Sequence, residues 1–264
     1  MKTLIRILFL VSGLFYSSLS LADRTANAPM VVHFSSGKLK LGGELFKPAG
    51  DGPFPVLIYN HGSAPGMLNS QASKAIAPLF VEKGWAFFMP YRRGQGLSSA
   101  AGKFIGDEIE AARKEGGLTE ASATMVRLLQ DDHLSDQLAA VAWIKTQKFI
   151  DTKKIAVAGN SFGGIETVLG VAREPYCAAV AAAAGAESWS VSPELQLIMK
   201  KAVVAAKTPI YFFQAENDFD LSPSRTLHSE MKAAGKISEI KIYPAFGRSA
   251  KDGHSFAYLE LVRS

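Results

Sequence analysis

The sequence predicts an α/β fold: a mostly parallel, doubly wound sheet that an antiparallel hairpin opens and that helices cover on both faces. Short apolar runs alternate with longer helix-like segments over residues 55–262, which is typical of parallel strands joined by helices. Residues 30–45 contain two adjacent strand-like runs separated by a short turn. Residues 155–169 contain a strand-like run, a glycine-rich turn around Ser161 and the start of a helix.

The first 22 residues have the composition of a secretory signal peptide. Lys2 and Arg6 give a positive start, residues 7–16 are apolar, and Ser20-Leu21-Ala22 is a small-x-small cleavage site. The apolar run is shorter than the roughly 20 residues that span a bilayer. We therefore expect cleavage after Ala22, no stable membrane anchor, and an exported protein, periplasmic or secreted, of bacterial origin.

Composition limits the possible partners of the remaining domain, residues 23–264. The chain is 48% hydrophobic and 20% charged, and its formal charge of +5 is not gathered in any Lys/Arg-rich run, so nucleic acid is not an expected partner. Cys177 is the one cysteine, which excludes an internal disulfide, and its apolar neighbours predict a buried thiol. No His, Cys and Asp cluster has metal-ligand spacing, so we expect neither metal nor cofactor. The oligomeric state is left open.

The expected strands follow from apolar periodicity. Residues 30–34 and 39–45 form the hairpin, because the second run alternates apolar and polar side chains and Ser36-Gly37-Lys38 suits a turn. Residues 55–59 are continuously apolar, which is typical of a strand covered on both faces. The remaining strands are expected at residues 85–89, 155–158, 178–184, 210–213 and 237–243.

Helices are expected between these strands, at residues 71–82, 121–148, 193–206, 223–234 and 255–262, with a further helix beginning near residue 165. Residues 97–120 are too long for an ordinary connection. We interpret them as a partly helical, cap-like excursion over the carboxyl edge of the sheet. A surface loop without regular structure is an equally good interpretation.

The turn Gly159-Asn160-Ser161-Phe162-Gly163 has the form G-x-S-x-G between a strand and a helix. Such a nucleophile elbow strains the backbone at the serine and holds its hydroxyl clear of the sheet. Flanking glycines let the strand and helix approach closely. The first N–H groups of the helix have no partners within it and can face a developing negative charge. Gly164 is followed by Ile165, which excludes a P-loop.

Polar residues just past the predicted strands are candidates for a site, because ligands of open α/β sheets bind beyond the carboxyl ends of the strands. They are Asn60, His61, Ser63, Tyr91, Arg92, Arg93, Ser161, Glu187, Trp189, Asp218, Asp220 and His254. A serine, an acid and a histidine occur at this edge in that chain order, which suits acyl transfer.

On these residues the chain resembles the α/β-hydrolases, near their dienelactone hydrolase-like and prolyl-oligopeptidase-like branch. The resemblance covers essentially all of residues 23–264. It depends on four blocks: residues 60–63, residues 91–96, the elbow, and Asp218 with residues 252–254. Dienelactone hydrolases have a cysteine in the elbow, whereas this chain has Ser161. The difference moves the expected substrate from dienelactones to ordinary esters.

The resemblance implies a carboxylesterase-like serine hydrolase that acts on a small ester. Ser161, Asp218 and His254 are its expected catalytic triad. The backbone N–H of Phe162 is one expected oxyanion donor, and the resemblance adds that of Ser63. His61 is given a structural role in the same loop.

Three acids could serve His254: Glu216, Asp218 and Asp220. Asp218 falls where the chain leaves the strand and can turn toward the histidine. Asp220 lies near the start of the next helix, where a carboxylate has the ordinary use of facing the positive helix end. We therefore prefer Asp218. The other histidines, His33, His133 and His228, are expected to be ordinary side chains.

Substrate contacts are harder to predict. We expect Tyr91, Trp189 and residues 97–120 to border the substrate. Arg92 and Arg93 could bind a substrate carboxylate, but we favour a role in which they pair with acids and hold the loop. An exported peptidase of aminoacyl or dipeptidyl type would use the same machinery, and a non-catalytic binding protein on this fold is a second alternative.

Overall fold

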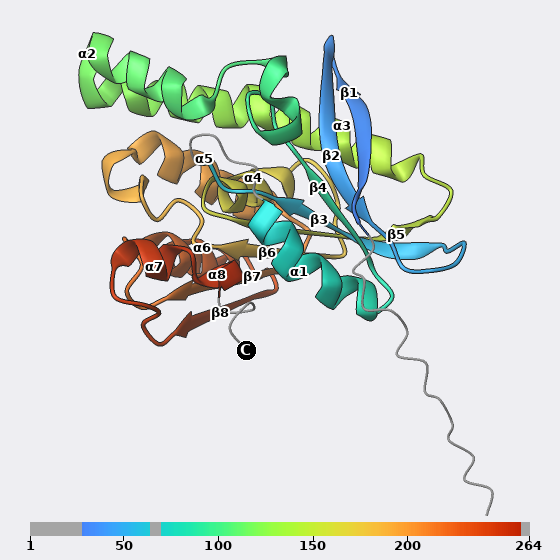
Figure 1. Ribbon diagram of the computed structural model, residues 1–264. Helices are drawn as coiled ribbons and strands as arrows, with labels where there is room; N and C mark the ends of the chain where they lie inside the picture. Colours follow the sequence, from blue (N-terminus) through green and yellow to red (C-terminus); the bar gives the residue numbers. More distant parts are fainter. Residues whose placement is uncertain (1–27, 64–69, 260–264) are drawn as a thin grey trace, which may run out of the picture.

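The computed structural model describes residues 28–63 and 70–259 (Figure 1). The predicted leader and its cleavage site lie outside these residues. No helix within the two ranges is both long enough and apolar enough to cross a membrane.

One sheet of eight strands is the centre of the fold, with the order β1-β2-β4-β3-β5-β6-β7-β8. β1 pairs antiparallel with β2 and β2 pairs antiparallel with β4, and all other neighbours are parallel. The predicted parallel sheet with an opening hairpin is therefore confirmed. The strands are β1 (Met30–Ser36), β2 (Leu39–Phe46), β3 (Phe54–Asn60), β4 (Ala86–Pro90), β5 (Ile150–Asn160), β6 (Ala178–Ala182), β7 (Ile210–Ala215) and β8 (Ser238–Tyr243).

Helices cover both faces of this sheet (Figure 1). α1 (Ser70–Glu82) and α8 (Phe256–Leu259) contact each other on one face. The helices on the other face include α3 (Leu134–Lys145), α4 (Phe162–Gly170), α5 (Pro193–Ala205) and α6 (Ser222–Ala233).

The central strands β3 and β4 contain continuous apolar runs because successive side chains enter, in alternation, the cores on the two faces of the sheet. Leu57 of β3 and Phe87 of β4 pack with Ile76 of α1. Their neighbours Ile58 and Phe88 belong to the core on the opposite face. Alternate side chains of a strand point to opposite faces of the sheet, so a sheet covered twice needs continuous apolar runs.

Residues 97–120 are largely helical, which agrees with the helical part of the first interpretation. A 3-10 turn, η1 (Gly96–Ala101), precedes α2 (Ile105–Arg127), which is interrupted at Gly116 and Gly117. The φ of Gly117 is +70°, a conformation that glycine adopts without steric cost. A π-helical turn, η2 (Leu128–His133), then leads into α3. The single helix predicted at residues 121–148 was therefore wrong in its bounds.

Two other sequence predictions differ from the structure in part. The closing helix expected at residues 255–262 is present as α8 from Phe256, and its last three predicted positions lie outside the described residues, but a short helix that was not predicted, α7 (Ala250–His254), precedes it. A capping box between Ser249 and Asp252 starts α7 early. Cys177 is exposed, not buried, because it lies just before β6, ahead of the point where the strand enters the core.

Candidate active site

Ser161 occupies a sharp turn between β5, which ends at Asn160, and α4, which begins at Phe162. Its φ and ψ are 58° and −125°, a conformation that costs a non-glycine residue on the order of 1–3 kcal/mol. The Ser161 N–H donates to the carbonyl of Ala182, and its own carbonyl accepts from the N–H of Ile165, both at 3.0 Å. These bonds hold the serine in the conformation expected of a nucleophile elbow.

The flanking glycines are required by close backbone approach. A Cβ at Gly163 would lie 1.9 Å from the carbonyl oxygen of Asn60, and a Cβ at Gly159 would lie 2.1 Å from the carbonyl oxygen of Gly163. No side chain fits at either position. The G-x-S-x-G pattern therefore has the steric origin that the sequence suggested.

The side chains of Ser161, His254 and Asp218 lie in one hydrogen-bonded line. His254 Nε2 is 2.8 Å from Ser161 Oγ, and His254 Nδ1 is 2.8 Å from Asp218 Oδ1. The carboxylate fixes the proton on Nδ1, which leaves Nε2 to accept from the serine hydroxyl. The structure thus brings together the three residues predicted as a triad.

Of the three candidate acids, the one that contacts His254 is Asp218. Its side chain is fully buried, and it also accepts from the N–H of Phe219 at 2.7 Å and from Gln214 Nε2 at 2.8 Å. Asp220 instead accepts from the N–H of Ser222 at the start of α6. This is the ordinary helix-end role that the sequence predicted for it.

Two asparagines that were not predicted as site residues hold the segment of His254 in place. Asn217 Nδ2 donates to the carbonyl oxygens of Phe246 and Ser249, at 2.8 and 2.9 Å, and so holds the segment that leads into α7. Asn160 Nδ2 donates to the carbonyl oxygen of His254 at 3.4 Å. Each lies beside a predicted triad residue in the sequence, which is the signal that could have identified it.

The loop of His61, Gly62 and Ser63 lies directly beside the elbow. A Cβ at Gly62 would lie 3.5 Å from Ser161 Cβ. Among the described residues, the amide N–H groups of Ser63 and Phe162 have no hydrogen-bond acceptor. Within this part of the chain, both predicted oxyanion donors are therefore available to another oxygen.

Residues 42–260 match the dienelactone hydrolase family. The chain belongs to this family. It is therefore an α/β hydrolase, and the serine in the elbow is its departure from the cysteine expected of authentic dienelactone hydrolases.

Solved structures with the same fold include peptidases and smaller hydrolases. The acylaminoacyl peptidase of Pyrococcus horikoshii is 16% identical, with a TM-score of 0.63 over 89% of this chain and 40% of its own. Est1E of Butyrivibrio proteoclasticus, solved with ferulic acid bound, is 16% identical, with a TM-score of 0.63 over 88% of this chain and 96% of its own. A Klebsiella pneumoniae chain described as a dienelactone hydrolase is 20% identical, with a TM-score of 0.59 over 90% of this chain and 100% of its own. This chain spans about 40% of the peptidase's length, and these identities show the fold alone.

In this member of the family, Arg92 holds the loop beside Ser161. Its Nη1 donates to the carbonyl oxygen of His61 at 2.6 Å, and its Nη2 donates to that of Gly62 at 3.1 Å. The Gly62 oxygen also lies 2.7 Å from His61 Nδ1. Burial, and then the neighbouring charge of Arg92, keep the pKa of His61 well below its usual value. His61 is therefore a neutral ring that donates through Nδ1.

Arg93 is occupied as well. It binds Asp132 of η2 at 2.7 Å and Asp136 of α3 at 2.8 Å. These pairs attach the segment after β4 to the helical excursion. The favoured interpretation, in which the arginines pair with acids and hold the loop, describes Arg93, whereas Arg92 holds the loop through carbonyl oxygens and pairs with no acid among the described residues. Both guanidinium groups are occupied by these contacts.

Beneath the elbow lies a buried polar cluster that the sequence did not reveal. Glu166 of α4 is 1% exposed, and both of its carboxylate oxygens lack a hydrogen-bond partner among the described residues. Burial raises the pKa of Glu166 to about 8, against an opposing effect of Arg92. Burial, with Arg92 and Arg93, lowers the pKa of His133 to about 2. Both groups are therefore mainly neutral near pH 7.

Two predicted substrate contacts need correction. Tyr91 is 0% exposed and packs in the core, with its ring centroid 5.4 Å from that of His61. Trp189 is 5% exposed and belongs to the same hydrophobic core as Leu195 and Met199 of α5. Both residues follow strands at the carboxyl edge, but their side chains turn inward because large aromatic rings favour burial.

The residue after β6 that reaches the site is Glu187. Its Oε2 lies 3.9 Å from His254 Nε2. Phe219, which follows Asp218, is 46% exposed, and its ring centroid lies 5.3 Å from that of His254. The sequence places Glu187 at this edge without indicating a role for it, and it gives no signal for Phe219.

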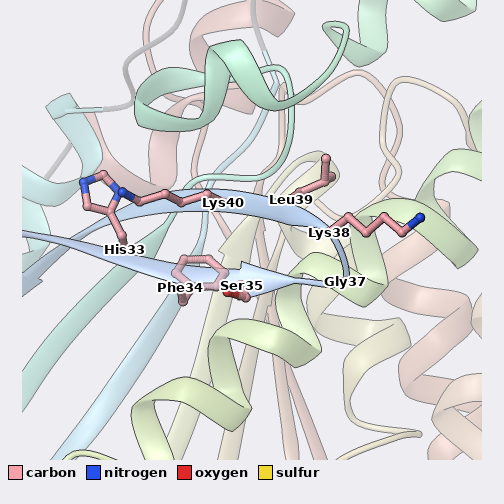
Figure 2. A pocket seen from close by; sticks show the side chains of 7 residues that line it. All are labelled: His33, Phe34, Ser35, Gly37, Lys38, Leu39 and Lys40. Atoms are coloured by element: carbon pink, nitrogen blue, oxygen red, sulfur yellow. The ribbon is translucent and has the colours of Figure 1, made fainter.

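The described surface has hollows that do not include Ser161. Figure 2 shows one along the β1–β2 hairpin, lined by side chains between His33 and Lys40. The hairpin is at one edge of the sheet, whereas Ser161 follows the central strand β5. Within the described ranges, no group of three or more His, Cys, Asp or Glu side chains could hold a metal ion.

Proposed function

We propose that this protein is a serine hydrolase that cleaves small carboxylic esters through an acyl-enzyme intermediate. The observation that carries the proposal is the pair of 2.8 Å contacts that link Ser161 to His254 and His254 to Asp218. A serine on a strained elbow, an imidazole and a buried carboxylate in this order are the elements of an activated nucleophile.

The reaction runs in two steps. Ser161 Oγ attacks the ester carbonyl as its proton moves to His254 Nε2, and Asp218 stabilises the imidazolium that forms. The carbonyl oxygen becomes an anion and accepts from the N–H groups of Ser63 and Phe162, each of which contributes about 3 kcal/mol at the transition state. His254 then gives its proton to the leaving alcohol. Water attacks the acyl-enzyme by the same route and releases the acid.

Three observations support esters as the substrate class. The elbow carries serine in a family whose dienelactone hydrolases use cysteine. Both arginines after β4 are occupied, so neither offers the free guanidinium that a substrate carboxylate would need. Est1E, which this chain matches over 96% of its length, was solved with ferulic acid, a carboxylic acid, bound. An exported peptidase is the second candidate, because amide cleavage uses the same machinery and the peptidase of Pyrococcus horikoshii shares the fold.

A panel of p-nitrophenyl esters of two to eight acyl carbons, with aminoacyl p-nitroanilides beside them, tests the substrate class. We expect kcat/KM for the short esters to exceed that for the anilides by several powers of ten, and Ser161→Ala to abolish both. A higher kcat/KM for the anilides would favour the peptidase. Folded protein that cleaves neither class would favour the binding protein.

We also propose that the protein is exported and that residues 1–22 are removed. The proposal depends on the charged start, the apolar run and the Ser20-Leu21-Ala22 site in the sequence. Mass spectrometry of the protein recovered from the envelope or the medium of its native host should give an amino terminus at Asp23. A cytoplasmic product that retains the leader would contradict it.

A further inference from the structure

Glu187 places a carboxylate beside the nitrogen that moves the proton. The turn after β6 adjoins the elbow, since the N–H of Ser161 donates to the carbonyl of Ala182. From this turn the Glu187 carboxylate comes within 3.9 Å of His254 Nε2, and its side chain is 52% exposed. The carboxylate therefore lies at the accessible side of the Ser161–His254 pair.

No lysine or arginine in the described part of the chain lies within ion-pair distance of this carboxylate. The guanidinium of Arg92 is directed to the carbonyls of the His61 loop, and that of Arg93 to two aspartates. A substrate next to His254 therefore meets an unneutralised negative charge.

The position of Glu187 identifies which half of the substrate it meets. In acyl transfer, Nε2 of the histidine gives its proton to the leaving group. A side chain beside Nε2 therefore lies beside the leaving alcohol, not beside the acyl chain. The half-exposed ring of Phe219 flanks the same imidazole, and an aromatic face also attracts cations.

We propose that Glu187 makes the leaving-group side of the site selective for alcohols that carry a positive charge, such as an amino or quaternary ammonium group, and unfavourable for anionic alcohols. This inference rests on the ester hydrolase function proposed above. Coulombic attraction across a half-exposed surface is modest, so the expected preference is a few-fold and not absolute.

Three thioesters with the same butyryl group test the inference. Their leaving thiols are thiocholine, the neutral isostere 3,3-dimethylbutanethiol, and the anion 3-mercaptopropanesulfonate. One thiol reagent detects all three products. We expect kcat/KM to fall in that order, by about threefold to fivefold at each step, the size expected of a half-exposed ion pair. Added salt should reduce the differences.

Charge reversal at Glu187 gives the decisive comparison. Glu187→Lys should invert the order of the charged thioesters, and Glu187→Gln should bring the cationic-to-neutral ratio close to one. Glu216→Gln is the matched control, because Glu216 is an exposed carboxylate after β7 with no contact to His254, and it should keep the wild-type ratio. Because each ratio is taken within one protein, differences in folded fraction cancel.

The outcomes separate this inference from the proposed function. Hydrolysis of the neutral thioester, with equal charge ratios in wild type and Glu187→Lys, would overturn the charge selectivity alone. If Glu187 only stabilised the imidazolium, its substitution would change kcat/KM for all three thioesters by the same factor. The ratios would then stay constant, which would also overturn the charge selectivity. Failure of wild type to cleave the neutral thioester and the p-nitrophenyl esters would overturn the ester hydrolase function itself.

Discussion

Arg92 holds His61 at two points: its backbone N–H donates to His61 Nε2 at 3.2 Å, and its Nη1 donates to the His61 carbonyl oxygen at 2.6 Å. The same guanidinium reaches the carbonyl of Gly62, which belongs to the peptide group whose N–H is that of Ser63. In a trans peptide the two groups point in opposite directions. Arg92 therefore sets the direction of a proposed oxyanion donor without touching the substrate.

Arg92→Lys should lower kcat by about tenfold or more, with little change in KM, because an ammonium cannot reach both carbonyls in the fixed geometry of a guanidinium. A transition-state analogue such as a trifluoromethyl ketone should bind more weakly in proportion to kcat. Arg93→Lys is the control, since Arg93 binds Asp132 and Asp136 instead. This substitution should lower the melting temperature and leave kcat close to the wild-type value. If the two substitutions lowered kcat equally, Arg92 would have no specific role in positioning the oxyanion donor.

Asp218→Asn should reduce kcat by several powers of ten. The amide cannot fix the proton on His254 Nδ1, and in the protease that provides the standard comparison such a change costs about 10⁴. Asp220→Asn should leave kcat within about twofold, because Asp220 binds the N–H of Ser222 at the start of α6. Steady-state kinetics of both variants, with circular dichroism to verify folding, measure the difference. The reverse ranking would show that the acid has been misassigned.

Glu166 should make the protein less stable as pH rises. Burial raises its folded-state pKa from the ordinary 4.5 to about 8. Between these values the unfolded chain has released the proton while the folded chain keeps it, so increasing pH favours unfolding. The stabilising contribution is complete below pH 4.5 and is lost as pH rises toward 8.

Urea unfolding of wild type and Glu166→Gln at pH 5, 6.5 and 8 measures this effect. The free energy of unfolding of wild type, relative to the variant, should decrease steadily over the series. His133 acts in the opposite sense below pH 6.5, since its folded pKa is lowered to about 2, and the subtraction removes its contribution. A constant difference between the two proteins would mean that Glu166 does not titrate as its burial requires.

The sheet and the elbow could be predicted because each depends on local sequence. β3 and the second half of β5 are apolar runs that end in polar residues, and the glycines around Ser161 are required by contacts as short as 1.9 Å. The choice of Asp218 over Asp220 also followed from local signals, namely where a strand ends and where a helix begins.

The excursion between β4 and β5 could not be predicted to the same extent. Its helices are held by tertiary pairs such as Arg93 with Asp136, which join residues far apart in the chain, and the π turn of η2 has no sequence signature. For Tyr91 and Trp189, the sequence predicted their positions after a strand but not the direction in which each side chain points. Glu187 reaches the site for a reason equally hidden in the sequence, the sharp turn at Ala183, whose φ is +50°.

The central claim is that Ser161 is the nucleophile, and labelling by a fluorophosphonate tests it most directly. The pure protein should gain one phosphonyl group, which peptide mass spectrometry should place on Ser161. His254→Ala should slow the labelling strongly, and Ser161→Ala should abolish it. Labelling that persists in folded Ser161→Ala, or wild-type protein that stays unlabelled, would contradict the account.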